Sequence, residues 1–157
     1  MDFDAFYRNE RVAVLRLCFL VTLDAEAAAD ATQEAMMRAF SRWDALSAQQ
    51  PAAWVRSVAL NLCRSRWRRM QVELRLTPRL YIVPAAPAGR DLDLLDALSR
   101  LPRRQREAVA LRYWAALSID ECASTMGLTA GSVSQHLARA RKTLRDSPAL
   151  LILEGTP

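Results

Sequence analysis

The sequence predicts an all-α protein made of two small helical domains and a flexible linker. Alanine is abundant and only 4 of the 157 residues are glycine, a composition that favours helices. Apolar residues recur at helical spacing over most of the chain. Residues 70–90 lack that spacing and carry three of the seven prolines, which indicates a linker between two helical parts.

The N-terminal part is predicted to hold three helices around one core. The first runs from Asp4 to about Thr22. The second follows Asp24, a good N-cap, and the third begins at Pro51, where proline is well tolerated, and ends at about Arg69. The apolar stripes expected to face the core are Phe6, Val14, Leu17, Cys18 and Val21, then Ala28, Ala35, Met36, Ala39, Phe40 and Trp43, then Trp54, Val55, Val58 and Leu62.

The C-terminal part contains a helical corner. A helix is expected from Pro102, although the arginines just after it oppose the helix dipole and need another reason to be there. Ser118 and Glu121 form a capping box, the helix that they open runs to Met126, and Gly127 supplies a left-handed stop. Thr129 then caps a second helix. Two helices joined by such a turn are the helix-turn-helix unit, whose second helix can enter the DNA major groove.

The second helix of this corner has a buried side and a polar side. Apolar residues fall at i, i+4, i+7 and i+11, at Val133, Leu137, Ala140 and Leu144. The opposite side carries Ser132, Gln135, Ala138, Arg139 and Lys142, with Ser134 on its flank. Small residues let a helix approach the groove, Gln and Arg can read base edges, and the later cations suit phosphates. His136 lies near the edge of the apolar side and is expected to pack or to contact a phosphate.

Charge and reactive groups favour binding over catalysis. Lys and Arg number 22 against 17 Asp and Glu, and nearly all the cations are arginine, which suits a polyanionic partner. The chain has three cysteines without a CxxC and one histidine, so no metal site and no disulfide framework is expected. Each cysteine is expected to be a buried thiol in a reducing compartment. No catalytic cluster or phosphate-cradling glycine loop is evident, so no cofactor and no enzymatic activity are expected.

The N-terminal sequence MDFDAFYRNE is acidic where a signal peptide would be basic, and no apolar run approaches the roughly 20 residues that span a bilayer. We therefore expect a cytoplasmic protein without membrane insertion.

Taken together, the two halves resemble the extracytoplasmic-function sigma factors, the small promoter-recognition subunits of bacterial RNA polymerase. The run DAEAAADATQEAMMRAFSRW resembles their polymerase-binding helix, and PAAWVRSVALNLCRSRWRR resembles their promoter-melting helix. LPRRQREAVALRYWAALSIDECASTMGLTAGSVSQHLARARKTLR follows their upstream-element domain almost without gaps. The resemblance implies a sigma region 2 domain over 1–70, a linker over 71–93, a sigma region 4 helix-turn-helix domain over 94–146 and a tail over 147–157.

The resemblance also implies roles for exposed polar residues. Docking on the clamp helices of the polymerase's largest subunit would fall to Asp30, Gln33, Glu34 and Arg38. The downstream, minus-10 promoter element would meet Arg56, Asn61, Arg64, Arg66, Arg68 and Arg69, and the loop 44–50 would receive a flipped base. The upstream, minus-35 element would meet Ser132, Ser134, Gln135 and Arg139, with Arg141 and Lys142 near phosphates. Further phosphate contacts are expected from Arg103, Arg104 and Arg106.

Some features do not follow the family pattern. Ser134 and His136 stand where many members carry a basic or larger residue, so the base preference cannot be transferred. Leu60 stands where many have arginine, which removes one possible phosphate contact. Trp43 and Trp54 are expected in the core, while Trp67 remains open between core and base stacking. The tail could pack on the second domain, act as a degradation signal or bind a regulator.

The expected function is an alternative sigma factor that binds core RNA polymerase and recognises two promoter elements. Its expected partners are the core enzyme, promoter DNA and an anti-sigma protein, although no anti-sigma interface can be read from the sequence. One alternative is a stand-alone helix-turn-helix regulator, which would bind DNA as a dimer without polymerase. Another is a protein-interaction module, whose binding to DNA would show little salt dependence.

Overall fold

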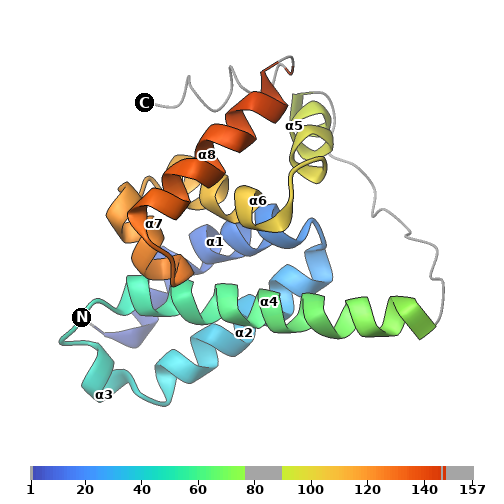
Figure 1. Ribbon diagram of the computed structural model, residues 1–157. Helices are drawn as coiled ribbons and strands as arrows, with labels where there is room; N and C mark the ends of the chain where they lie inside the picture. The colour runs from blue at the N-terminus through green and yellow to red at the C-terminus, as the bar shows by residue number, and fades with distance from the viewer. Residues whose placement is uncertain (1, 77–89, 146, 148–157) are drawn as a thin grey trace. The chain divides into compact units, whose positions relative to one another are not determined.

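The computed structural model describes residues 2–76, 90–145 and 147, and the described part contains helices and no strand (Figure 1). The chain divides into two compact units, Met1–Val83 and Pro84–Pro157. The prediction of an all-α fold with two small helical domains is confirmed. Residues 77–89 of the predicted linker and nearly all of the predicted tail lie outside the described residues.

The first unit contains α1 (Phe3–Thr22), α2 (Ala25–Phe40), the short α3 (Trp43–Leu46) and α4 (Pro51–Leu76), of which α1, α2 and α4 pack against one another. α1 ends because Leu23 turns left-handed, with φ 54°. The carboxylate of Asp24 then accepts a hydrogen bond from the amide of Ala27 at 3.0 Å and so caps α2, as predicted. The buried face of α2 is mostly alanine, and these small side chains let α1 and α4 approach closely.

The second unit contains α5 (Arg90–Ser99), α6 (Arg103–Val109), the π-turn η1 (Ala110–Trp114), α7 (Ile119–Met126) and α8 (Ala130–Leu144). Both bonds of the predicted capping box are present, at 2.8 Å and 3.2 Å between Ser118 and Glu121. Gly127 adopts φ 65° and ends α7, and the Thr129 hydroxyl accepts from the Ser132 amide at 3.2 Å. The helix-turn-helix corner is therefore confirmed, with α8 packed on α6 and α7.

Several predicted elements are wrong in detail. Phe40, predicted in the core, is the last residue of α2 and is 66% exposed, because the helix ends there instead of continuing to Trp43. Trp43 instead opens α3 and packs edge-on against Phe3, but it is only half-buried, so its predicted place in the core is wrong. The first residues of the segment 44–50, predicted as a loop, belong to this helical turn.

The third helix also differs from the prediction. α4 continues to Leu76, past the end predicted at about Arg69, and α5 begins at Arg90, where a linker was expected. Val58 and Leu62, predicted to face inward, are only half-buried. Ala59, Leu60 and Cys63 are buried in their place, so the buried face of the helix lies further round than the predicted stripe. Cys18, Cys63 and Cys122 are all buried thiols, as predicted.

Candidate functional site

The polar side of α8 is assembled as the sequence predicts. Val133, Leu137, Ala140 and Leu144 are buried in the second unit. On the rest of the helix the candidate DNA-contacting residues Ser134, Gln135, Arg139, Arg141 and Lys142 are exposed, and Ser132 is half-buried. The Thr129 hydroxyl donates to the Ser132 Oγ at 3.0 Å, so Ser132 is held within the N-terminal cap of the helix. A helix with this surface can enter the major groove with its polar side.

Arg141 is held by a residue that the sequence analysis did not select. Its Nε and one Nη donate to the Tyr113 hydroxyl at 2.9 Å and 2.6 Å. The guanidinium carbon also lies 5.9 Å from the centre of the Tyr113 ring. The two residues are 28 positions apart. Helical periodicity, which relates only near neighbours, could not reveal the pair.

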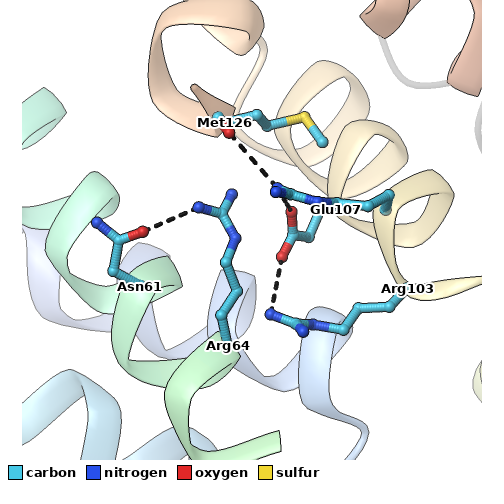
Figure 2. A network of polar contacts seen from close by, with 6 residues as sticks. Asn61, Arg64, Arg103, Glu107 and Met126 are labelled. Atoms are coloured by element: carbon cyan, nitrogen blue, oxygen red, sulfur yellow. Dashed lines mark hydrogen bonds and ion pairs between the residues drawn. The ribbon is translucent and has the colours of Figure 1, made fainter. Parts of the chain in front are cut away.

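The arginines at the start of α6 face an internal carboxylate (Figure 2). Glu107 is fully buried, and its two carboxylate oxygens accept from Arg103 at 3.4 Å and from Arg104 at 3.0 Å. Arg104 also reaches the carbonyl of Met126, the last residue of α7, at 3.4 Å. These contacts give the cations a structural reason to stand at a helix start. Burial lowers the pKa of Arg106, which donates to the Leu98 carbonyl at 3.4 Å.

In the first unit, the candidate downstream-element residues follow one another along α4. Arg64 donates to the side-chain carbonyl of Asn61 at 2.9 Å (Figure 2). Arg68 and Arg69 are exposed, as is Trp67, whose side chain is 42% exposed and therefore not in the core. Arg56 differs from this group, because it is only 21% exposed and lies 3.8 Å from the carboxylate of Glu10 on α1.

The candidate polymerase-docking residues lie on α2. Asp30, Gln33 and Arg38 are exposed and Glu34 is half-buried. Glu34 and Arg38 form an ion pair at 2.7 Å along the same helix. Asp30 instead forms an ion pair with Arg66 of α4, so one docking candidate contacts one DNA-binding candidate. The hydrogen bond from Arg66 to Asp30 raises the pKa of Arg66.

A groove of about 720 Å³ lies between α1 and α2. Gln33 lines it together with aromatic and sulfur-containing side chains, among them Tyr7, Met37 and Phe40. These three are 38%, 58% and 66% exposed, so the groove presents an apolar surface to solvent. This groove was not predicted from the sequence, because Phe40 was expected in the core and the pattern gave Tyr7 no surface role.

In the residues that the structure describes, no group of three or more His, Cys, Asp or Glu side chains lies together in a way that could hold a metal ion. Within the same residues, no helix is both long enough and apolar enough to span a bilayer.

Comparisons with known proteins identify both units. Residues 6–72 match the family description of sigma-70 region 2, and residues 91–144 match that of sigma-70 region 4. RNA polymerase sigma-E factor of Streptomyces avermitilis is 31% identical over 154 residues, covering 93% of this chain and 84% of that protein. ECF RNA polymerase sigma factor SigM of Mycobacterium tuberculosis is 30% identical over 151 residues, covering 90% and 74%.

Solved structures show the same fold. The sigma factor RpoE of Bartonella quintana, in complex with the anti-sigma factor NepR, is similar with a TM-score of 0.78 at 24% identity, over 92% of this chain and 95% of that one. CnrH, in complex with the cytosolic domain of CnrY, is similar with a TM-score of 0.63 at 24% identity, over 96% and 87%. The chain therefore belongs to the sigma-70 family, in its extracytoplasmic-function group, and is an alternative sigma factor that binds core RNA polymerase and directs transcription from specific promoters.

Proposed function

We propose that the two units divide promoter recognition between them. The polar side of α8 reads the upstream element, with Ser132, Ser134, Gln135 and Arg139 toward the bases and Arg141 and Lys142 toward phosphates. The observation that carries this assignment is the exposure of these polar side chains, apart from the half-buried Ser132, opposite a fully buried apolar side of the same helix. Gln and Arg supply the donor and acceptor patterns that distinguish adenine and guanine in the major groove.

The downstream element is assigned to α4 and to the turn before it. Asn61, Arg64, Arg66, Arg68 and Arg69 lie on consecutive turns of one helix and supply amide and cationic groups for a single strand. Trp67 stands among them with its ring partly exposed, which favours base stacking over a role in the core. Arg56 is the weakest member of the set, because its contact with Glu10 gives it a structural partner within the unit.

Core polymerase docks on α2 in this proposal. The polar residues Asp30, Gln33, Glu34 and Arg38 supply register, since charged rims govern orientation and association rate more than affinity. The adjacent groove supplies the apolar part of the interface, because Gln33 lines it and Met37 and Phe40 stand exposed on the same helix. A desolvated aromatic or sulfur-containing anchor beside a polar rim is the usual composition of a binding hot spot.

An anti-sigma protein is a further proposed partner, since the similar RpoE structure holds the anti-sigma factor NepR. We also propose that the chain acts in the cytoplasm, where it would meet polymerase and DNA. It would act by binding alone, with no covalent step of its own. The region 2 domain is proposed over 1–70 and the region 4 domain over 94–146, joined by 71–93 and followed by the tail 147–157.

Runoff transcription tests the assignment of the promoter elements. Core polymerase is incubated with a promoter library, with and without the full chain, and the transcript starts are sequenced. New starts that share a spaced pair of upstream sequences are expected. Gln135→Ala should relax the preference at one upstream position, whereas Lys142→Ala should weaken transcription evenly across sequences. An unchanged upstream preference in Gln135→Ala would remove α8 from base reading.

Core binding is tested separately by titrating labelled core enzyme with the full chain. Phe40→Ala and Gln33→Ala are expected to weaken binding. Val12→Ala is the matched control, because Val12 is also an exposed apolar residue, 49% exposed, on α1 but outside the groove lining. Equal affinities for Phe40→Ala and Val12→Ala would exclude the groove from the interface.

A further inference from the structure

The contact between Tyr113 and Arg141 leaves a specific set of hydrogen-bond donors for a ligand. A guanidinium has five N–H donors in a planar fork, and Arg141 uses its Nε–H and one Nη–H on the Tyr113 oxygen. Of the three N–H groups that remain, two lie parallel along the end of the fork, one on each Nη. The Tyr113 oxygen accepts both bonds, and its own O–H has no acceptor in the described part of the chain. The pair therefore presents a guanidinium edge next to a hydroxyl donor.

Both side chains are held in place before any ligand binds. Tyr113 lies in η1, the π-turn after α6, and is half-buried, so the second unit covers part of its side chain. Two hydrogen bonds and the ring contact at 5.9 Å then hold the exposed Arg141. An arginine that is already ordered loses less conformational entropy on binding than a free one.

The position of Arg141 on α8 determines which part of the DNA the Tyr113–Arg141 pair would face. Arg141 follows Ser134 by seven residues, which places both on nearly the same side of the helix. That side flanks the polar surface around Gln135 and Lys142, with the buried Leu137 and Leu144 beyond it. When the polar surface of a helix faces the floor of the major groove, its flanks face the phosphates of the groove walls.

We propose that Tyr113 and Arg141 together form one phosphate-binding site, in which the guanidinium edge and the Tyr113 hydroxyl donate to the same backbone phosphate beside the upstream element. This proposal rests on the proposed role of α8 and adds Tyr113 as a contact and positioning residue. Charge-assisted bonds from an arginine fork to a phosphate are short and strong, and the hydroxyl adds a further donor. The site fixes the register of α8 and carries no base specificity of its own.

Single neutral phosphates provide the test. Holoenzyme made with the full chain is bound to duplexes carrying the upstream element selected by runoff transcription. Each duplex has one methylphosphonate, which removes the charge of one phosphate. Wild type is compared with Tyr113→Phe, which keeps the ring and removes only the hydroxyl, and with Arg141→Gln. Lys142→Gln is the control, because Lys142 lies about 100° further round the same helix. Circular dichroism confirms that each variant is folded.

The expected result has two parts. In wild type, replacing one particular phosphate beside the element by a methylphosphonate weakens binding. This loss of affinity disappears in Arg141→Gln and is smaller in Tyr113→Phe. Lys142→Gln changes the loss at a different position. Tyr113→Phe weakens binding about threefold to tenfold, as expected when one hydroxyl no longer donates to a charged ligand. The salt dependence of binding by Tyr113→Phe stays that of wild type. In Arg141→Gln the slope of log K against log salt concentration becomes shallower by about 0.9, because the variant neutralises one phosphate fewer.

Two other results distinguish failure of this inference from failure of the proposed role of α8. If wild type discriminates the upstream element but Tyr113→Phe matches it at every phosphate position, Tyr113 does not contribute and the inference is overturned, while α8 keeps its role. If wild-type holoenzyme shows no preference for any upstream sequence, the proposed role of α8 fails and the inference falls with it.

Discussion

The carboxylate of Asp30 on α2 accepts a hydrogen bond from the guanidinium of Arg66 on α4, across a groove of about 540 Å³. Asp24, Glu26 and Glu34 line the acidic wall of this groove, and Arg69 stands with Arg66 on the basic wall. Asp30 is assigned to polymerase docking and Arg66 to the downstream element. In the free chain the two proposed surfaces therefore contact each other, and we expect the carboxylate of Asp30 to compete with DNA phosphates for Arg66.

Asp30→Asn separates the two roles. The pair is exposed, with the side chains of Arg66 and Asp30 37% and 59% exposed, so its loss should lower the free energy of unfolding by less than about 1 kcal/mol. Released from Asp30, Arg66 should bind a single-stranded downstream-element oligonucleotide up to about fivefold more tightly in the free chain. Binding to core enzyme should weaken.

Fluorescence anisotropy with the labelled oligonucleotide measures the first effect, and titration of core enzyme measures the second. For the oligonucleotide measurement Glu34→Gln is the control, because it removes the same charge from α2 but Glu34 pairs with Arg38 on its own helix. Oligonucleotide affinity that stays at the wild-type value in Asp30→Asn, or rises equally in Glu34→Gln, would show that the pair does not restrain Arg66.

The capping signals were predicted correctly because they act over three or four residues. Ser118 with Glu121 and Asp24 with Ala27 are such neighbours, and Gly127 needs only its own backbone freedom. The polar side of α8 was predicted for the same reason, since a helix repeats every 3.6 residues.

The long-range contacts could not be predicted in this way. Arg66 is 36 residues from Asp30 and Arg141 is 28 from Tyr113, and both pairs depend on how helices pack. Phe40 was misplaced because an apolar residue at helical spacing looks the same whether its helix continues or ends there. The exposure of Phe40 bears on the candidate site, because an exposed aromatic ring that lines a groove together with other apolar side chains indicates a binding surface.

Glu107 is expected to be the most sensitive charged residue of the second unit. Glu107→Ala leaves Arg103 and Arg104 without this carboxylate and truncates a fully buried side chain, which should cost about 2–3 kcal/mol because Arg104, 42% exposed, can return to water. The substitution should also loosen the end of α7, because Arg104 reaches the Met126 carbonyl. Hydrogen exchange followed by mass spectrometry on peptides of α6 to α8 measures this free energy in the full chain.

The control for Glu107 is Asp96→Ala. Asp96 also pairs with an arginine, Arg100, but the two side chains are 63% and 66% exposed. This change should alter protection by less than about 0.5 kcal/mol. Similar losses for Glu107→Ala and Asp96→Ala would show that burial gives Glu107 no special weight.

Two glycines of the helix-turn-helix should respond with opposite signs. Gly127 has φ 65° and open space where a Cβ would stand, so Gly127→Ala costs about 1 kcal/mol from backbone conformation alone. Gly131 lies in the first turn of α8, and an added Cβ would come no closer than 4.0 Å to the Thr129 hydroxyl. Gly131→Ala should stabilise the unit by about 0.5–1 kcal/mol. Hydrogen-exchange protection of α7 and α8 measures the stability change in both variants. A lower protection in Gly131→Ala than in wild type would contradict the predicted stabilisation.

Cys122 is expected to be an unreactive thiol in the folded protein. Burial raises its pKa to about 11, although the charge of Arg112 opposes the shift. At pH values between the ordinary pKa of the thiol and about 11, the unfolded chain ionises Cys122 while the folded chain keeps it protonated. The free energy of unfolding therefore falls as the pH rises through this range, and below the range the thiol has no effect on it. Cys122→Ala should remove this part of the fall in exchange protection of α7 between about pH 9 and pH 11.

Alkylation with iodoacetamide at about pH 8.5, followed by peptide mass spectrometry, tests the same residue directly. Because only the thiolate reacts, Cys122 should react at least about tenfold more slowly in the folded chain than in urea. Burial also shields the sulfur of Cys122 from the reagent. Raising the pH to about 9.5 distinguishes this steric shielding from the effect of the raised pKa. A thiol with the ordinary pKa of 9.0 then gains about threefold in thiolate, whereas the rate at Cys122 should rise nearly tenfold because its thiolate fraction is still small. A rise of only about threefold at Cys122 would contradict the raised pKa and leave steric shielding as the sole protection.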